Sequence, residues 1–260
     1  MSDTYNILAI GDVVSMQACE YLKQKLWSIR KYHNISFTIV NGENSADGNG
    51  ILKQSADMLI EAGADAISGG NHTFRRREVY SYLDDSPCCI RPANMPASAP
   101  GYGSRIIEAD SKRVLVINLL GNVYMDICDN PFDCADKILE ANKGKYDYAI
   151  VDFHAEATSE KAALARYLDG RVSVVFGTHT HVATADEQIL PGGTGFITDI
   201  GMVGVTDSIL GVKSEIIIEK FTTRMPVRFE QAHGEVSASG TIFTLDKTSG
   251  KCIKAERISF

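Results

Sequence analysis

The sequence has no uninterrupted apolar run of about eighteen residues, the length that a membrane-spanning helix needs. Residues 1–5 are mostly polar and carry neither a basic segment nor a small-residue cleavage site, so we expect no secretory signal and a cytoplasmic protein. No two cysteines have the C-x-x-C spacing of zinc sites and redox centres, and we expect reduced, mostly structural thiols. The cysteines are Cys19, Cys88, Cys89, Cys128, Cys134 and Cys252.

Positive charge is also scarce in this chain. The formal net charge is −7, with 26 Lys and Arg residues against 33 Asp and Glu residues. Binding along a nucleic-acid backbone needs clustered cations, so this balance argues against an extended DNA or RNA footprint. A small anionic substrate stays open, because local cations can reverse the overall field.

Internal repeats and low-complexity runs are missing too, and 260 residues, 44% of them hydrophobic, are enough for one sizeable core. We therefore expect a single domain over residues 1–260. Short β-rich apolar runs alternate with amphipathic stretches, which predicts βαβ units and an α/β fold whose sheet is covered by helices. The expected strands are Tyr5–Ile10, Ser36–Val40, Ala64–Ser68, Val114–Leu119, Tyr148–Phe153 and Val172–Phe176. The expected helices are Met16–Lys31, Lys53–Ala62, Arg75–Leu83, Pro131–Lys143 and Ser159–Leu168.

Two segments depart from this alternation. Near the C-terminus, Arg228–Gln231, Glu235–Leu245 and Cys252–Ile258 read as strands joined by turns, and we expect them to complete a second sheet in antiparallel fashion. Ser86–Gly103 is rich in Pro, Ala, Gly and Ser. We interpret it as a long surface excursion, which could form a small cap around residues 75–108, rather than as a linker between domains.

Polar, metal-capable side chains follow five of the expected strands. Because the carboxyl ends of strands in an open α/β sheet line one crevice, we expect these side chains to converge although they lie far apart in the sequence. Their oxygen and imidazole donors suit Mn, Fe or Zn, and they are too many for one ion but about right for two. The seven candidates are Asp12, Glu43, Asn44, Asn71, His154, His179 and His181.

Each candidate alone has an explanation that involves no metal. Gly11-Asp12 could be only a turn, Glu43 a solvated loop carboxylate, and the two asparagines turn residues. A lone His154 is more often a hydrogen-bonded structural histidine. The Gly-x-His-x-His run at 177–181 is more specific, because it frames two imidazoles directly after a buried strand.

His72 follows Asn71 directly and so lies near the expected metals. A general acid must protonate the leaving oxygen when a phosphorus–oxygen bond breaks, and the ordinary pKa of histidine, about 6.5, suits that task. The alternative is that His72 is another ligand or a structural group.

Several stretches together resemble the calcineurin-like metallophosphoesterases, and within them the YmdB-like branch of 2′,3′-cyclic-nucleotide 2′-phosphodiesterases. The resemblance runs nearly from end to end. The stretches are IGDVV (10–14), NGENSADGNG (41–50), GADAISGGNHTF (63–74), RPANMP (91–96), DFHAEATSEK (152–161), GTHTHVATAD (177–186), ITDIGMVG (197–204) and ILGVKSEIII (209–218).

The resemblance implies a two-sheet β-sandwich flanked by helices, in four layers α/β/β/α, and a homo-oligomer. It also implies that Glu43 bridges two ions and that His72 is the acid. One ion would bind Asp12, Asn44 and His181, and the other Asn71, His154 and His179.

Two departures from the wider superfamily match the YmdB-like branch: Asp12-Val13-Val14 replaces Asp-x-His, and the bridging residue is Glu43 instead of Asp. Other differences are particular to this chain and concern substrate preference, namely Ser15 in place of Gly, Val203–Ser208, and Arg75, Arg76 and Arg77 after Phe74. The arginines could contact phosphate, or form a solvated face near the N-terminus of a helix.

These observations favour a dinuclear phosphodiesterase that opens a 2′,3′-cyclic, or also a 3′,5′-cyclic, nucleotide by attack of metal hydroxide on phosphorus. Iron or manganese is the expected metal, and zinc is the alternative. The alternatives are a phosphomonoesterase or nucleotidase on the same scaffold, and a regulatory nucleotide-binding metalloprotein linked to RNA turnover.

Overall fold

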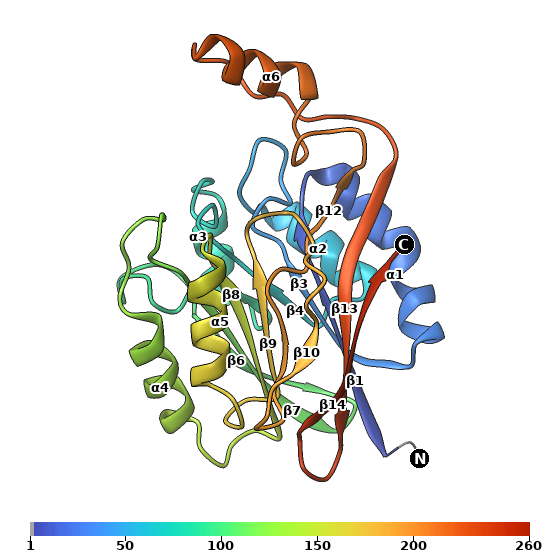
Figure 1. Cartoon of the computed structure of the whole chain (residues 1–260), viewed down its shortest axis with the longest axis vertical. Coiled ribbons are helices and arrows are strands. Elements are labelled where there is room, and N and C mark those ends of the chain that lie inside the picture. The colour runs from blue at the N-terminus through green and yellow to red at the C-terminus, as the bar shows by residue number, and fades with distance from the viewer. Residues whose placement is uncertain (1–2) are drawn as a thin grey trace.

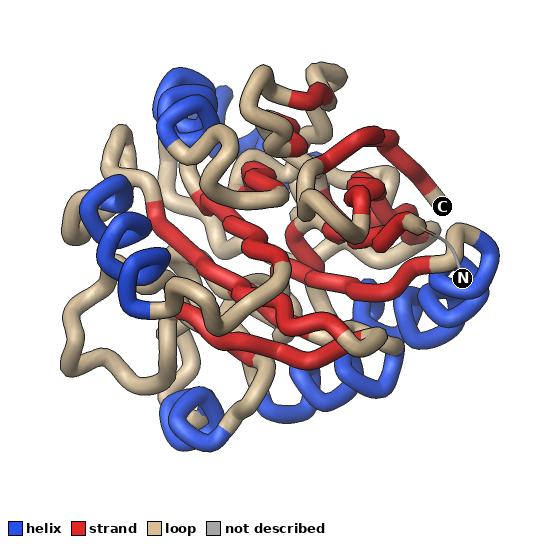
Figure 2. The backbone as a smooth tube through the Cα atoms, turned by 90° about the horizontal axis from the view of Figure 1, so that it is seen from below, coloured by secondary structure: helices blue, strands red, loops and turns tan. Residues whose placement is uncertain are grey.

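The computed structural model describes residues 3–260, which form two β-sheets packed face to face between helices (Figures 1 and 2). The first sheet has the order β2-β12-β13-β1-β3-β4-β5, with β14 paired to β13. Its strands are β1 (Thr4–Ile10), β2 (Asp12–Val13), β3 (Ile35–Asn41), β4 (Ala66–Ser68), β5 (Cys89–Ile90), β12 (Met202–Val205), β13 (Val236–Asp246) and β14 (Cys252–Ser259).

The second sheet has the order β10-β11-β9-β8-β7-β6. Its strands are β6 (Ser104–Ala109), β7 (Lys112–Leu120), β8 (Tyr148–His154), β9 (Val174–Thr178), β10 (Gln188–Ile189) and β11 (Gly195–Ile197). The helices are α1 (Met16–Tyr32), α2 (Lys53–Ala62), α3 (Val79–Asp85), α4 (Pro131–Ala141), α5 (Thr158–Tyr167) and α6 (Ser214–Thr223).

The period-two alternation of each strand produces the layers. In β1, Ile7 faces the second sheet and packs in the central core, whereas Leu8 faces outward and packs in the cluster that holds Leu22 of α1 and Leu59 of α2. On the other side, α4 and α5 cover the outer face of the second sheet. The strands are therefore buried on both faces, which explains why they read as nearly continuous apolar runs.

The parallel pairing sets where chemistry can gather. Strands β1, β3, β4 and β5 run parallel to one another, as do β7, β8, β9 and β11. The carboxyl ends of the strands in each sheet thus lie at one edge. No helix among residues 3–260 is long and apolar enough to cross a membrane.

Three sequence-based expectations for the C-terminal part and for α3 were wrong. The hairpin β13–β14 joins the first sheet beside β1 instead of completing the second, because β13 pairs along the whole of β1. Arg228–Gln231 is no strand: only Gln231 makes an isolated bridge, to Val212, since no long neighbour extends the pairing. Helix α3 begins at Val79 rather than Arg75, because a turn with a hydrogen bond from the Arg75 amide to the His72 carbonyl precedes it.

The expectation of a surface excursion over Ser86–Gly103 was wrong for residues 89–94. Cys89 and Ile90 are fully buried and extend the first sheet as β5. Asn94 is also buried, and its side-chain amide donates to the Leu120 carbonyl (2.8 Å). The sheet edge thus absorbs part of a segment whose composition indicated a loop. Helix α6 was not predicted, and it extends away from the layers at the top of Figure 1.

Candidate metal centre

The eight side chains singled out in the sequence gather at one end of the sandwich. Each sits at or just past the carboxyl end of a strand: Asp12 after β1, Glu43 and Asn44 after β3, Asn71 and His72 after β4, His154 at the end of β8, and His179 and His181 after β9.

Glu43 lies at the middle of the group and is 1% exposed. Its Oε2 is 3.3 Å from His154 Nε2 and accepts a hydrogen bond from the His72 backbone amide (2.9 Å). Its Oε1 is 3.1 Å from His72 Nδ1 and accepts from the Asn44 side-chain amide (2.8 Å). One carboxylate therefore touches members of both sheets, which is the position that a bridging ligand needs.

Asp12 supplies an unsatisfied charge beside Glu43. Its carboxylate is fully buried, and Oδ1 has no hydrogen-bond partner. Burial and repulsion from Glu43 raise the pKa of Asp12 well above its ordinary value. Ligand atoms of Asp12, Glu43 and His181 lie within 4.8 Å of one another. A buried carboxylate in this state is stabilised by a cation, so the residues fit a metal ion.

The groups behind His154 orient its ring. Its Nδ1 lies 3.0 Å from Thr178 Oγ1, and that hydroxyl donates to Asp152 Oδ1 (2.7 Å). Because the Thr178 hydrogen points at Asp152, Thr178 accepts from His154 Nδ1–H, which leaves the Nε2 lone pair free for a metal. Burial lowers the pKa of His154 to about 3, so the ring is neutral at physiological pH. Nε2 of His154 is 2.9 Å from Asn71 Oδ1 and 3.1 Å from His179 Nδ1.

The loop after β9 holds its two histidines in an uncommon backbone conformation. His179 has φ 101° and His181 has φ 64°, a region that costs residues with a side chain of the order of 1–3 kcal/mol each. Two buried carboxylates tie this loop down. Asp12 Oδ2 accepts from the His179 amide (3.1 Å), and Asp199 Oδ2 accepts from the Thr180 amide (3.2 Å).

Asp199 is itself held by Lys161 of α5. The two side chains are each 1% exposed and lie 2.7 Å apart. Sequence reasoning missed this pair, as it missed Asp152 and Thr178, although all four lie in or beside the stretches that carry the resemblance. The available signal was a charged residue at a position where an apolar one was expected: Asp152 inside a buried strand and Lys161 on the buried face of a helix.

Glycine is required at one point of the centre. A Cβ at Gly70 would overlap the Glu43 carboxylate and the His154 ring. The backbone between β4 and Asn71 can thus pass close to both side chains only without a side chain of its own.

A cavity of about 580 Å³ opens beside the group. It is lined on one side by His72, His179 and His181, and His72 is 23% exposed there. Much of the remaining lining belongs to the segment around α6 and is mostly apolar, with Lys220 and Glu230 as its charged members.

The three arginines after Phe74 precede α3 instead of lying on it. Arg75 and Arg77 are exposed, and Arg76 donates from its guanidinium to the carbonyls of Asp47 and Asn49 (Nε to Asn49, 3.2 Å). Arg76 thus shapes the loop after Glu43.

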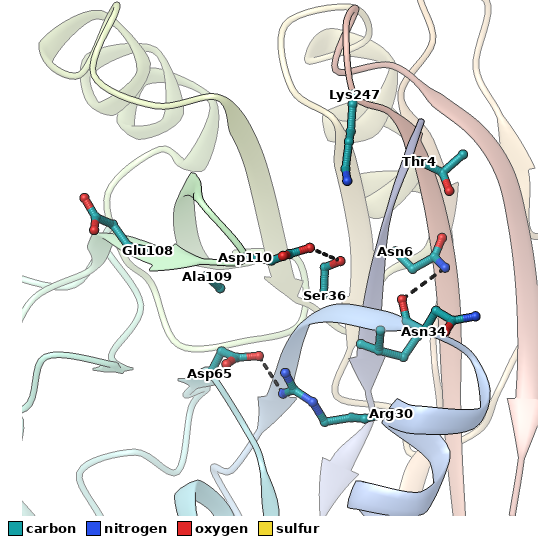
Figure 3. Close-up of a pocket in the computed structure, with 11 residues that line it drawn as sticks. Thr4, Asn6, Arg30, Asn34, Ser36, Asp65, Glu108, Ala109, Asp110 and Lys247 are labelled. Carbon is teal, nitrogen blue, oxygen red and sulfur yellow. Dashed lines mark hydrogen bonds and ion pairs between the residues drawn. The ribbon is translucent and has the colours of Figure 1, made fainter. Parts of the chain in front are cut away.

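A second cavity, of about 660 Å³, lies at the opposite end of the strands, where β1, β3 and β4 begin (Figure 3). Three of its charged side chains have partners: Arg30 contacts Asp65 (2.6 Å), and Asp110 accepts from Ser36 (2.8 Å). None of the eight predicted residues lines it.

The comparisons with known proteins agree with this geometry. The family model described as YmdB-like protein matches residues 8–258. The 2′,3′-cyclic-nucleotide 2′-phosphodiesterase of Bacillus subtilis (strain 168) is 46% identical over 252 residues, which span 97% of this chain and 96% of that protein.

Two solved structures share the fold over nearly their whole length. A novel phosphatase from Mycoplasma pneumoniae has a TM-score of 0.93 at 32% identity and covers 100% of this chain and 94% of its own. A hypothetical protein from Thermus thermophilus has a TM-score of 0.92 at 39% identity and covers 98% of both chains. The predicted α/β two-sheet fold of the metallophosphoesterases is thereby confirmed, and the chain belongs to the YmdB-like family.

Proposed function

We propose that this protein is a metal-dependent phosphodiesterase that opens 2′,3′-cyclic nucleotides, with 3′,5′-cyclic nucleotides as a second substrate that the same chemistry allows. The observation that carries the proposal is the fully buried Asp12 carboxylate, whose Oδ1 has no hydrogen-bond partner, beside Glu43 and His181 at a cavity. The 46% identity to a cyclic-nucleotide phosphodiesterase supports the choice of substrate.

The ligand set is part of the proposal. Glu43 would bridge two ions, with Asp12, Asn44 and His181 on one and Asn71, His154 and His179 on the other. Iron or manganese fits the oxygen and imidazole donors first, and zinc third. When bound, such ions supply an activated water and offset charge on the phosphoryl oxygens.

His72 is the proposed general acid. Its Nδ1 lies 2.9 Å from Asn44 Oδ1, so a proton on Nδ1 is held there and Nε2 is the nitrogen that can exchange a proton. The side chain lines the cavity and reaches solvent, as a group that meets a leaving oxygen must. With a 2′,3′-cyclic substrate, protonation of the 2′-oxygen would leave a 3′-phosphate.

The chain residues around the ligands position them. Thr178 and Asp152 hold the tautomer of His154, and Asp199 with Lys161 holds the loop that carries His179 and His181. The six cysteines are free, which supports the proposal of a cytoplasmic protein. We also propose a homo-oligomer.

The test combines metal analysis of fresh protein with hydrolysis of 2′,3′-cyclic AMP, 3′,5′-cyclic AMP and p-nitrophenyl phosphate, with and without added Mn²⁺. About two metals per chain and preferential opening of a cyclic diester are expected. A strong preference for the monoester would favour the phosphatase instead. If none of the three substrates is hydrolysed but nucleotide is bound, the regulatory metalloprotein is favoured.

A further inference from the structure

The cavity beside the metal centre continues past the proposed ligands to an apolar wall. This wall comes from a segment that the proposed chemistry does not use: the loop before α6, α6 itself and the loop at 225–231. Its apolar side chains on the cavity are Ile209, Leu210, Val212, Ile217, Phe221 and Phe229. Four of the proposed ligands, Glu43, Asn44, His179 and His181, line the same cavity as these side chains.

Most of this wall is open to solvent. Phe221 is 65% exposed, Phe229 50% and Leu210 46%, and Ile217 is the one residue of α6 that is buried. The helix extends away from the sandwich at the top of Figure 1. Exposed aromatic side chains gathered beside a catalytic cavity indicate a binding surface.

The wall is held in place by contacts between its two arms. The Lys213 amide donates to the Glu230 carbonyl (3.0 Å), and the two side chains form an ion pair (2.7 Å). The Ala232 amide donates to the Gly211 carbonyl (2.9 Å). Lys220 Nζ lies 4.6 Å from the centre of the Phe229 ring. The aromatic rings are therefore presented on a braced loop, which reduces the entropy that is lost when a ligand binds.

The chemistry of the two sides of the cavity indicates what joins them. The ligand side suits a phosphate, and the far side suits a flat apolar group. In a cyclic nucleotide the ribose separates these two parts. The cavity volume of about 580 Å³ lies in the range of roughly 300–1,000 Å³ that is typical of small-molecule sites.

We propose that Phe221 and Phe229, with Leu210 beside them, form a nucleobase subsite on which the base of the substrate stacks while its phosphate lies at the metal centre. This inference rests on the proposed function and concerns the nucleobase, the part of the substrate that the metal centre would not contact. Stacking accepts any base, because every base has a π face, so all four cyclic nucleotides bind.

The experiment compares substrates with and without a base. For the full-length, metal-loaded protein, kcat/KM is measured for 2′,3′-cyclic AMP and for 1-O-methyl-ribose 2,3-cyclic phosphate. The variants are Phe221→Ala, Phe229→Ala and the conservative Phe221→Tyr. Tyr32→Ala is the matched control, because Tyr32 is 81% exposed at the far end of α1. Melting temperature and oligomeric state are followed for each.

Each alanine variant is expected to lose about tenfold in kcat/KM for the nucleotide, mainly through KM, and to keep its rate on the base-free diester. Phe221→Tyr and Tyr32→Ala should stay close to the parent protein on both substrates. Equal losses on both substrates, or no loss on either, would overturn the subsite. A dissociated oligomer with an unchanged ratio between the substrates would also overturn it and would assign the wall to a second copy of the chain.

A binding measurement separates this inference from the proposed function. Equilibrium dialysis compares 3′-AMP with ribose 3-phosphate on the same variants. If the parent protein opens neither diester, the proposed function fails, and weaker binding of 3′-AMP alone to Phe221→Ala still supports the subsite. Equal binding of both ligands to parent and variant would refute the subsite even where the diesterase is active.

Discussion

Two cavities of similar volume lie at opposite ends of the strands and differ in how their charged groups are satisfied. At the end where β1, β3 and β4 begin, Arg30 is paired with Asp65, and Asp110 accepts from Ser36. At the end where these strands finish, Asp12 is fully buried and one of its oxygens has no partner. Volume does not separate the two sites, since the two cavities are of similar size. The unsatisfied buried charge of Asp12 distinguishes the two sites, because only a ligand can satisfy it.

Removal of the metal should have the largest effect on activity. Exhaustive chelation is expected to abolish turnover, and Mn²⁺ should restore it. Glu43→Gln should lose both metal and activity, because the bridging charge is gone. Metal content by mass spectrometry and hydrolysis of 2′,3′-cyclic AMP are the measurements. Full activity in the chelated protein would contradict the assignment of the centre.

His72→Ala should separate catalysis from metal binding. Loss of a general acid lowers kcat by about 10²–10⁴-fold, while the metal content should be retained. A variant that loses its metal would show that His72 is a ligand instead. His33→Ala, on a histidine at the far end of α1, serves as the control.

Lys161→Met tests the buried pair behind the histidine loop. Leaving the Asp199 carboxylate without its cation should lower the free energy of unfolding by about 3–5 kcal/mol, measured by denaturant titration. Lys23→Met removes an exposed ion pair with Glu61 and should cost less than about 1 kcal/mol. Equal effects of the two substitutions would mean that burial of the pair does not matter.

Thr178→Val removes the hydroxyl between His154 and Asp152. Metal affinity is expected to fall about 10–100-fold, because the ring is no longer held with Nε2 free. Thr178→Ser keeps the hydroxyl and should keep the affinity. If both variants bind metal alike, the hydroxyl has no part in orienting His154.

Asp110→Asn should have the smallest effect. The carboxylate lies in the larger cavity, accepts a hydrogen bond from Ser36 and is far from the metal centre. We expect kcat/KM and metal content to stay within about twofold of the parent values, as for most surface substitutions. A large loss of activity would show that the two cavities are coupled and would break the comparison.

Much of the fold could be predicted because the signals for it are local. The apolar run of β8 and the amphipathic pattern of α2 each predict their element to within a residue or two. Pairing between distant strands could not be predicted from the local sequence. The sequence of Val236–Asp246 does not indicate that it pairs with β1, because that pairing depends on which sheet edge is free after the rest has packed.

The candidate site divides in the same way. The sequence by itself determined which side chains reach the crevice, because a polar residue directly after a buried parallel strand has one place to go. Asp12, Glu43 and His154 follow from that rule, and their roles as ligands stay a prediction. Only the tertiary structure showed that one oxygen of Asp12 lacks a partner, that Thr178 lies between His154 and Asp152, and that Phe221 borders the same cavity. These facts depend on distances between segments far apart in the chain, and such distances exist only once the two sheets have packed together.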